Sequence, residues 1–116
     1  MRFGIDIVDI ERLRAALERQ PAIEPRLFAP SEISYCRARR DPVVHLAGRL
    51  AAKEAVIKVL RVGKLPVWAR RISVENDPDG APTCRVDSPD GTRALGVSIS
   101  HDGGSAVAVA WDGAGS

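Results

Sequence analysis

The chain has 116 residues, 45% of them hydrophobic and 28% charged, which suits one domain over residues 1–116 with its own core. No run of about 18 apolar residues is present, and the N-terminal segment lacks the long apolar run of a signal peptide, so we expect no membrane span or leader. Cys36 and Cys84 lack the spacing of a metal site or a disulfide framework, so we expect packed thiols in a reducing cytoplasm.

Charge is unevenly distributed, although the net charge is only +2. Residues 1–71 hold 15 Lys or Arg against 8 Asp or Glu, whereas residues 72–116 hold 2 against 7. A basic half of this kind suits nucleic acid, a phosphate-rich small molecule or an acidic protein. Because the chain has just five aromatic residues and no nucleic-acid-binding motif, we favour a small anionic ligand or an acidic protein partner over nucleic acid.

An apolar, β-branched segment predicts a strand over residues 3–8. Asp6 interrupts it, and a buried carboxylate needs a partner or a metal, although Asp also favours turns at the ends of strands. Asp9 is placed to cap the helix that follows. Arg12 and Arg14 decorate this helix, either as an ordinary solvated face or as a docking surface for an acidic partner.

Proline residues divide the next part of the chain. Pro21 and Pro25 predict a loop, and Pro30 in a first helical turn predicts a short helix. The Asp-Pro pair at residues 41–42 predicts the cap of a longer helix, after which residues 61–69 read as a loop.

The stretch from residue 48 to residue 58 is the strongest helical signal, with good helix formers and no proline. Glu54 and Lys58 are four residues apart, which is typical of an ion pair on a solvated face. These charges and Lys53 border the apolar stripe, where a partly desolvated charge needs a partner or a function. Glu54 is therefore a candidate ligand for a hard cation, and the two lysines are candidates to contact phosphate. His45, without a second ligand, reads as a structural or surface residue.

The second half of the chain changes to a period of two, which is typical of strands. We expect strands over residues 71–75, 82–87, 97–101 and 105–111, followed by a loose polar tail at residues 112–116. The predicted fold class is α+β, with one long and two shorter helices packed against an antiparallel sheet. Ser100 and His101 should point to opposite faces of the sheet, which argues against a Ser–His nucleophile. His101, beside a glycine turn, is a candidate ligand contact.

Three separated motifs resemble the holo-acyl-carrier-protein synthases, the small single-domain 4′-phosphopantetheinyl transferases. The motifs are GIDI at residues 4–7, GRLAAKEA at residues 48–55 and VSISH at residues 97–101. Their order and spacing make the resemblance specific, and it extends over most of the chain.

The resemblance implies transfer of 4′-phosphopantetheine from coenzyme A to a serine of an acyl carrier protein, with release of adenosine 3′,5′-bisphosphate. It implies that Asp6 and Glu54 hold a Mg²⁺ ion on the pyrophosphate and that Lys58 contacts the pyrophosphate. Glu54 is also the candidate base for the serine, directly or through water. The alternative function is a non-catalytic module that binds coenzyme A or a carrier protein, and carriers of fatty acid (lipid) or of secondary metabolism both fit.

The resemblance further implies coenzyme A contacts, partner contacts and an assembly. Arg49 and His101 match positions near the nucleotide end of coenzyme A, and the expected contacts also include Lys58, Gly63 and Ser100. The helix that carries Arg12 and Arg14 is expected to dock the acidic carrier protein. A homotrimer with sites between subunits is expected as well.

Three departures from the family pattern stand out. Arg2 occupies a position where the family usually has glycine. Residues 88–96 are short where relatives carry a helix, and the loop at residues 61–69 is abbreviated. Both short segments bear on the trimer and on the choice of carrier more than on the metal pair.

Overall fold

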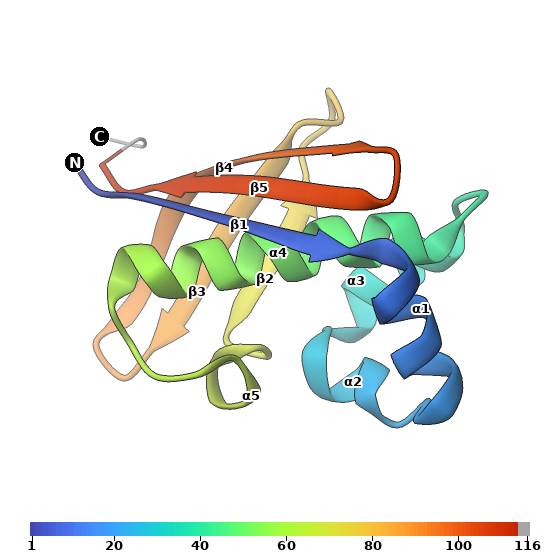
Figure 1. The fold of residues 1–116 in the computed structure, drawn as a ribbon. Helices are drawn as coiled ribbons and strands as arrows, with labels where there is room; N and C mark the ends of the chain where they lie inside the picture. Colours follow the sequence, from blue (N-terminus) through green and yellow to red (C-terminus); the bar gives the residue numbers. More distant parts are fainter. Residues whose placement is uncertain (114–116) are drawn as a thin grey trace.

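The computed structural model describes residues 1–113, which form a five-stranded antiparallel sheet with a long helix across one face (Figure 1). The strands are β1 (Phe3–Asp9), β2 (Ile72–Asn76), β3 (Pro82–Ser88), β4 (Gly91–Asp102) and β5 (Ser105–Trp111). Their spatial order is β1-β5-β4-β3-β2, so β1 and β2 form the two edges of the sheet.

The helices are α1 (Ile10–Arg19), α2 (Ile23–Leu27), α3 (Pro30–Arg37), α4 (Pro42–Leu60) and α5 (Leu65–Trp68). The α+β prediction is confirmed, and Asp9 caps α1 as expected, because its Oδ1 accepts a hydrogen bond from the Arg12 amide at 2.9 Å. Within residues 1–113, no helix combines the length and apolarity needed to cross a bilayer.

Two short helices were missed from the sequence. The segment after Pro21 and the segment 61–69 were both predicted as loops, and the structure contradicts this for α2 and α5. Pro25 and Pro66 lie in the first turns of these helices, where the missing amide proton would have had no intrahelical partner anyway. Proline therefore starts helices here where we expected it to break them.

Strand β4 begins at Gly91, six residues before the predicted start at residue 97. Residues 91–95 pair with β3, for example Arg93 with Val86, and Gly91–Ala94 are exposed. A strand segment that is exposed on both faces lacks the alternation from which strands are recognised. At the C-terminal end, Asp112 exchanges hydrogen bonds with Arg2, and the remainder of the predicted tail, residues 114–116, lies outside the described residues.

Helix α4 is buried on most of its circumference, because the sheet covers one side and the shorter helices cover the other. The predicted apolar stripe is part of a wider buried surface that also includes small residues such as Ala51, Ala52 and Ala55, all 0% exposed. Small side chains allow the helix to lie close to β1 and β5. Cys36 and Cys84 are free and buried, as expected, and burial raises the pKa of the Cys84 thiol to about 12.

Lys53 is the most unusual residue of α4, because it is 0% exposed. Its ammonium group donates hydrogen bonds to the Glu32 carboxylate at 2.6 Å and to the carbonyls of Leu27 and Ala69, each at 2.8 Å. Burial lowers the pKa of Lys53, and the Glu32 charge opposes this effect. All three ammonium protons are engaged inside the protein, so the possibility that Lys53 contacts phosphate is wrong.

Glu32 completes this buried pair from α3, and it is 1% exposed. Beside Lys53, its carboxylate accepts hydrogen bonds from the backbone amides of Ala29 at 2.8 Å and Val74 at 3.0 Å. The pair therefore joins α3, α4 and β2 with the ends of α2 and α5. A buried ion pair with this many hydrogen bonds is costly to break, because the remaining charge would be left unpaired.

Replacing Lys53 with Met should lower the free energy of unfolding by about 3–5 kcal/mol, because Glu32 then stays buried without its counter-ion. Urea unfolding measures this change, and adding Glu32→Gln should recover part of the loss. The control is Arg85→Ala, which removes an exposed pair to Glu75 at 3.9 Å and should cost no more than about 1 kcal/mol. Equal effects of Lys53→Met and the control would refute this account.

Candidate active site

Asp6 lies in the middle of β1, paired with Ala108 of β5, and on the face of the sheet that α4 covers. The alternative that it caps a turn at the end of the strand is therefore wrong. Gly4, two residues earlier, explains how the strand approaches the helix. A Cβ atom at Gly4 would lie 2.2 Å from the carbonyl oxygen of Ala55, so glycine permits the close approach that brings Asp6 to α4.

Glu54 and Lys58 meet Asp6 at this edge of the sheet. The Lys58 ammonium donates to the Asp6 carboxylate at 3.0 Å and to the Ile5 carbonyl at 2.8 Å. Among the described residues, Lys58 forms its ion pair with Asp6 and not with Glu54. The expected surface ion pair between Glu54 and Lys58, four residues apart on the helix, is therefore not present among these residues. Burial raises the pKa of Glu54, the Asp6 charge raises it further, and the Lys58 charge opposes both. We call Asp6, Glu54 and Lys58 the acidic cluster.

The acidic cluster fits a magnesium ion. Burial is the main cause of the raised pKa of Glu54, and the Asp6 charge adds to it; a cation between the two carboxylates would offset both effects. Within residues 1–113 there is no group of three or more His, Cys, Asp or Glu that could enclose a metal. Mg²⁺ suits such a site, because it commonly takes one or two carboxylates and completes its shell with phosphate oxygens and water.

Arg49 lies on a different side of α4 and is 5% exposed. Its guanidinium lies 4.3 Å from the centre of the Tyr35 ring, and its Nη2 donates to the Asn76 side-chain oxygen. The Nε of Arg49 has no hydrogen-bond partner among the described residues. Arg49 lines a hollow of about 190 Å³ together with Ser31, Tyr35, Val74, Glu75 and Asn76. A buried, partly unsatisfied cation beside a hollow is the arrangement expected of an anion site.

Further arginine and histidine side chains gather around Arg49. The Arg39 guanidinium lies 3.6 Å from the centre of the Tyr35 ring, and the rings of His45 and His101 are 6.3 Å apart. Burial lowers the pKa of His45, and the charges of Arg49, His101 and Arg39 lower it further. The interpretation of His45 as an isolated residue missed this grouping, although its position four residues before Arg49 puts both on one helix face. We call Arg39, His45, Arg49 and His101 the basic cluster.

The two clusters lie on opposite sides of α4. Arg49 and Lys58 are nine residues apart, which is about 180° around a helix. Arg49 bonds to Asn76 of β2 and Lys58 bonds to Asp6 of β1, and these strands are the two edges of the sheet. One chain therefore does not bring the predicted metal ligands together with the predicted nucleotide contacts.

Two other predicted coenzyme A contacts lie apart from the basic cluster. Ser100 pairs with Val107 of β5, and its side chain lies on the opposite face of the sheet from that of His101. Gly63 follows the C-terminal end of α4, beside Trp68, where a Cβ atom would lie 3.4 Å from the indole nitrogen. The coenzyme A contacts of Ser100 and Gly63 therefore stay predictions. Within a single chain, these two residues do not lie with Arg49 and His101.

The two arginines expected to dock a partner differ in their surroundings. Arg14 donates to Asp41 at 3.0 and 3.1 Å and to Glu11 at 3.0 Å, so it ties α1 to the start of α4. Asp41 stands at the N-cap position of α4, and its carboxylate accepts hydrogen bonds from the Arg14 guanidinium. The hydrogen bonds from Arg14, and then its charge, lower the pKa of Asp41.

Arg12, in contrast, is exposed and lines a groove between β1, α1 and α4. The groove has a volume of about 290 Å³ and is lined by Ile7, Val8, Asp9, Arg12, Leu13, Ala16 and Leu50. It begins one residue beyond Asp6 on β1. An apolar groove with a basic residue beside it suits an amphipathic, acidic partner.

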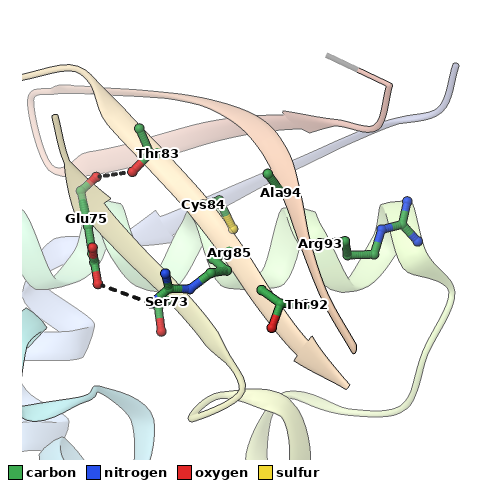
Figure 2. Close-up of a pocket in the computed structure, with 8 residues that line it drawn as sticks. All are labelled: Ser73, Glu75, Thr83, Cys84, Arg85, Thr92, Arg93 and Ala94. Carbon is green, nitrogen blue, oxygen red and sulfur yellow. Dashed lines mark hydrogen bonds and ion pairs between the residues drawn. The ribbon is translucent and has the colours of Figure 1, made fainter. Parts of the chain in front are cut away.

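A separate hollow of about 370 Å³ lies over β2, β3 and β4, distant from the acidic cluster on β1 (Figure 2). Figure 2 shows polar side chains from all three strands, including Glu75 and Arg85, whose charged groups are 3.9 Å apart. Because the Glu75 carboxylate lines this hollow and pairs with Arg85, the hollow does not resemble a phosphate site.

A family model for the 4′-phosphopantetheinyl transferase superfamily matches residues 2–110, and the chain belongs to this superfamily. A holo-[acyl-carrier-protein] synthase of Chlorobaculum tepidum is 42% identical over 113 residues, which cover 95% of this chain and 96% of the relative. The resemblance to the holo-acyl-carrier-protein synthases seen in the three motifs is confirmed.

Solved structures of holo-[acyl-carrier-protein] synthases have the same fold as this chain. The holo-[acyl-carrier-protein] synthase of Helicobacter pylori in complex with coenzyme A has a TM-score of 0.80 and 32% identity, covering 95% of this chain and 98% of that one. The Bacillus anthracis enzyme in complex with coenzyme A has a TM-score of 0.77 and 30% identity, covering 93% and 91%.

Proposed function

We propose that this protein transfers 4′-phosphopantetheine from coenzyme A to a serine of an acyl carrier protein in the cytoplasm. The observation that carries the proposal is the acidic cluster, which β1 and α4 assemble in a chain of the 4′-phosphopantetheinyl transferase superfamily. The Helicobacter pylori relative in complex with coenzyme A supports the choice of co-substrate.

Asp6 and Glu54 would hold a Mg²⁺ ion, which when bound offsets the negative charge of the pyrophosphate. Lys58 stands within hydrogen-bond reach of Asp6 at 3.0 Å and is half exposed, so its ammonium can turn from the carboxylate toward a phosphate oxygen. Its role is electrostatic stabilisation of charge that develops on the phosphoryl group.

Glu54 is the proposed general base. Burial, and then the Asp6 charge, raise its pKa, so the carboxylate is more basic than that of an ordinary glutamate. The carrier serine oxygen forms a bond to the β-phosphorus of coenzyme A, and the serine proton passes to Glu54, directly or through water. The phosphoanhydride bond breaks, and adenosine 3′,5′-bisphosphate leaves with the electron pair of that bond.

The basic cluster is the proposed site for the nucleotide end of coenzyme A, whose phosphates carry negative charge. Arg49 offers a buried guanidinium with an unpaired Nε, and His101 and His45 lie beside it. Charge-assisted hydrogen bonds from arginine to phosphate are strong and directional.

We further propose that the complete site forms between subunits of a homotrimer. The two clusters lie on opposite sides of α4, so one coenzyme A molecule would reach both more readily across an interface. The sheet face away from α4 offers an apolar surface: Phe3, Ile5 and Ile7 of β1 are 67%, 59% and 65% exposed. They pair with Trp111, Val109 and Val107 of β5. An exposed apolar patch of this kind marks an interaction surface.

The proposed docking surface for the acidic carrier protein is the groove beside Arg12, because it begins next to Asp6 and combines apolar lining with a basic residue. Arg14 supports this surface from behind by joining α1 to α4 through Asp41. A carrier helix in the groove would present its serine near the acidic cluster.

Replacing Glu54 with Gln should lower transfer at least about 100-fold, because one metal ligand and the general base are both lost. The assay follows the mass increase of an apo carrier protein incubated with coenzyme A and Mg²⁺, and circular dichroism checks the fold. Undiminished turnover in this variant would falsify the role of Glu54. Binding of coenzyme A by the unmodified protein without any transfer, insensitive to chelator, would favour the non-catalytic module.

Replacing Arg12 with Ala should raise the KM for the carrier protein about tenfold and leave the KM for coenzyme A unchanged, because the charge at the groove is lost. The matched control is Arg93→Ala, an exposed arginine on β4 away from the groove. An equal effect of both substitutions would assign the attraction to overall charge and not to the groove.

Mixing two inactive variants tests whether the site is shared. Chains with Asp6→Asn and chains with Arg49→Ala, refolded together in equal amounts, should regain about a quarter of wild-type turnover if each site takes one cluster from each of two neighbouring subunits. Sedimentation of the mixture checks the assembly. No recovery in a mixture that does assemble would place both clusters of each site in one chain.

A further inference from the structure

Asn76, the last residue of β2, holds the Arg49 guanidinium through a fixed amide. Its side-chain oxygen accepts from Arg49 Nη2, and its side-chain nitrogen donates to the Gly80 carbonyl at 2.8 Å. Because each end of the amide has its own partner, the group cannot rotate without losing a hydrogen bond.

The turn that holds Asn76 is itself well tied. The Asp77 carboxylate accepts from the amides of Asp79 and Ala81, each at 2.9 Å, and the Asp77 amide donates to the Ala81 carbonyl at 2.8 Å. Gly80 has a φ of +88°, which favours glycine at this point of the turn. The β2–β3 hairpin therefore presents the Asn76 amide to Arg49 from a rigid support.

The acceptor for Arg49 is neutral, and this distinguishes it from Arg14 and Arg37. Arg14 is held by Asp41, and Arg37 by Glu24. Buried arginines ordinarily pair with a carboxylate, because an uncompensated buried charge is costly. Arg49 is 5% exposed, yet its side-chain hydrogen bond goes to an amide.

The nearest carboxylate of the hollow does not compensate Arg49 either. Glu75 lines the hollow, but its Oε1 pairs with Nη2 of Arg85 at 3.9 Å. The positive charge and the unpaired Nε of Arg49 are thus both preserved beside an open volume.

We propose that Asn76 is a positioning residue for Arg49: it fixes the guanidinium toward the phosphates of the nucleotide end of coenzyme A without neutralising its charge. This inference rests on the proposed function, in which the basic cluster binds that end. A carboxylate at position 76 would hold the guanidinium equally well and would compete with the ligand for its charge.

Asn76→Asp separates this role from a merely structural one, because it keeps the size and the acceptor for Arg49 and adds a negative charge, at the cost of the donor to the Gly80 carbonyl. We expect at least about a tenfold increase in the KM for coenzyme A, with kcat and the KM for the carrier nearly unchanged. Thermal unfolding should show a folded variant close to the wild type in stability, because the charged pair with Arg49 offsets the lost hydrogen bond to the Gly80 carbonyl. A structural anchor alone would leave the KM for coenzyme A unchanged in such a variant.

A binding measurement gives a readout that does not depend on turnover. Calorimetric titration with adenosine 3′,5′-bisphosphate should show affinity reduced by a similar factor in Asn76→Asp and in Arg49→Ala. The matched control is Ala81→Asp, which adds the same charge to the exposed turn of the same hairpin. We expect this control to bind like the wild type at about 0.15 M salt, where exposed charges are screened.

The outcomes separate this inference from the proposed function. Weaker binding in Arg49→Ala with unchanged binding in Asn76→Asp would overturn the role of Asn76 and leave the proposed function in place. Equal losses in Asn76→Asp and Ala81→Asp would also overturn it, because general repulsion would then be the cause. Tight binding in Arg49→Ala would remove the nucleotide site from the basic cluster, and the role of Asn76 with it.

Discussion

The buried ion pair between Lys53 and Glu32 determines how α4 is rotated in this fold. Because the Lys53 ammonium bonds to α3 and to the ends of α2 and α5, that side of the helix must face the shorter helices. Glu54 follows in sequence, about 100° further around the helix, and therefore faces the β1 edge, where Asp6 lies. A fully engaged lysine thus fixes the direction of a carboxylate that the proposed chemistry requires to be accessible.

Three cations of α4 show how the surroundings of a charge decide its use. Lys53 is compensated by Glu32 inside the protein and is unavailable to a ligand. Lys58 forms an ion pair with Asp6 at the surface, where solvent weakens the pair and the ammonium can exchange partners. Arg49 is buried, but its acceptor is the neutral amide of Asn76, so its charge stays uncompensated. Burial alone therefore does not decide whether a cation is compensated; the charge of its acceptor and the exposure of the pair decide it together.

The sequence predicted the regular parts of the fold and only part of the site. Periodicity and capping residues were sufficient for α1, α4 and the last hairpin, because these elements bury one face continuously. The short α2 and α5, with proline in their first turns, and the exposed beginning of β4 carry no such pattern. Asp6 and Glu54 were connected by a family resemblance, since 48 positions separate them in the chain. The partner of Lys53, and the contact between Arg49 and Asn76, could not be predicted because no local spacing encodes contacts between distant segments.

The positions of the two clusters explain why the proposed assembly would matter for chemistry. A helix presents opposite sides to opposite edges of the sheet, so α4 can carry both an acidic and a basic cluster without mutual neutralisation. That separation protects each cluster within the chain, but it also prevents one chain from placing both on the same small ligand. Phe3, Ile5 and Ile7 form an exposed apolar face, and packing this face against a second copy would bury it. The second copy would then be a neighbouring chain that could supply the missing cluster. The same hydrophobic burial that stabilises an interface would then complete the site, which makes assembly and activity two consequences of one contact.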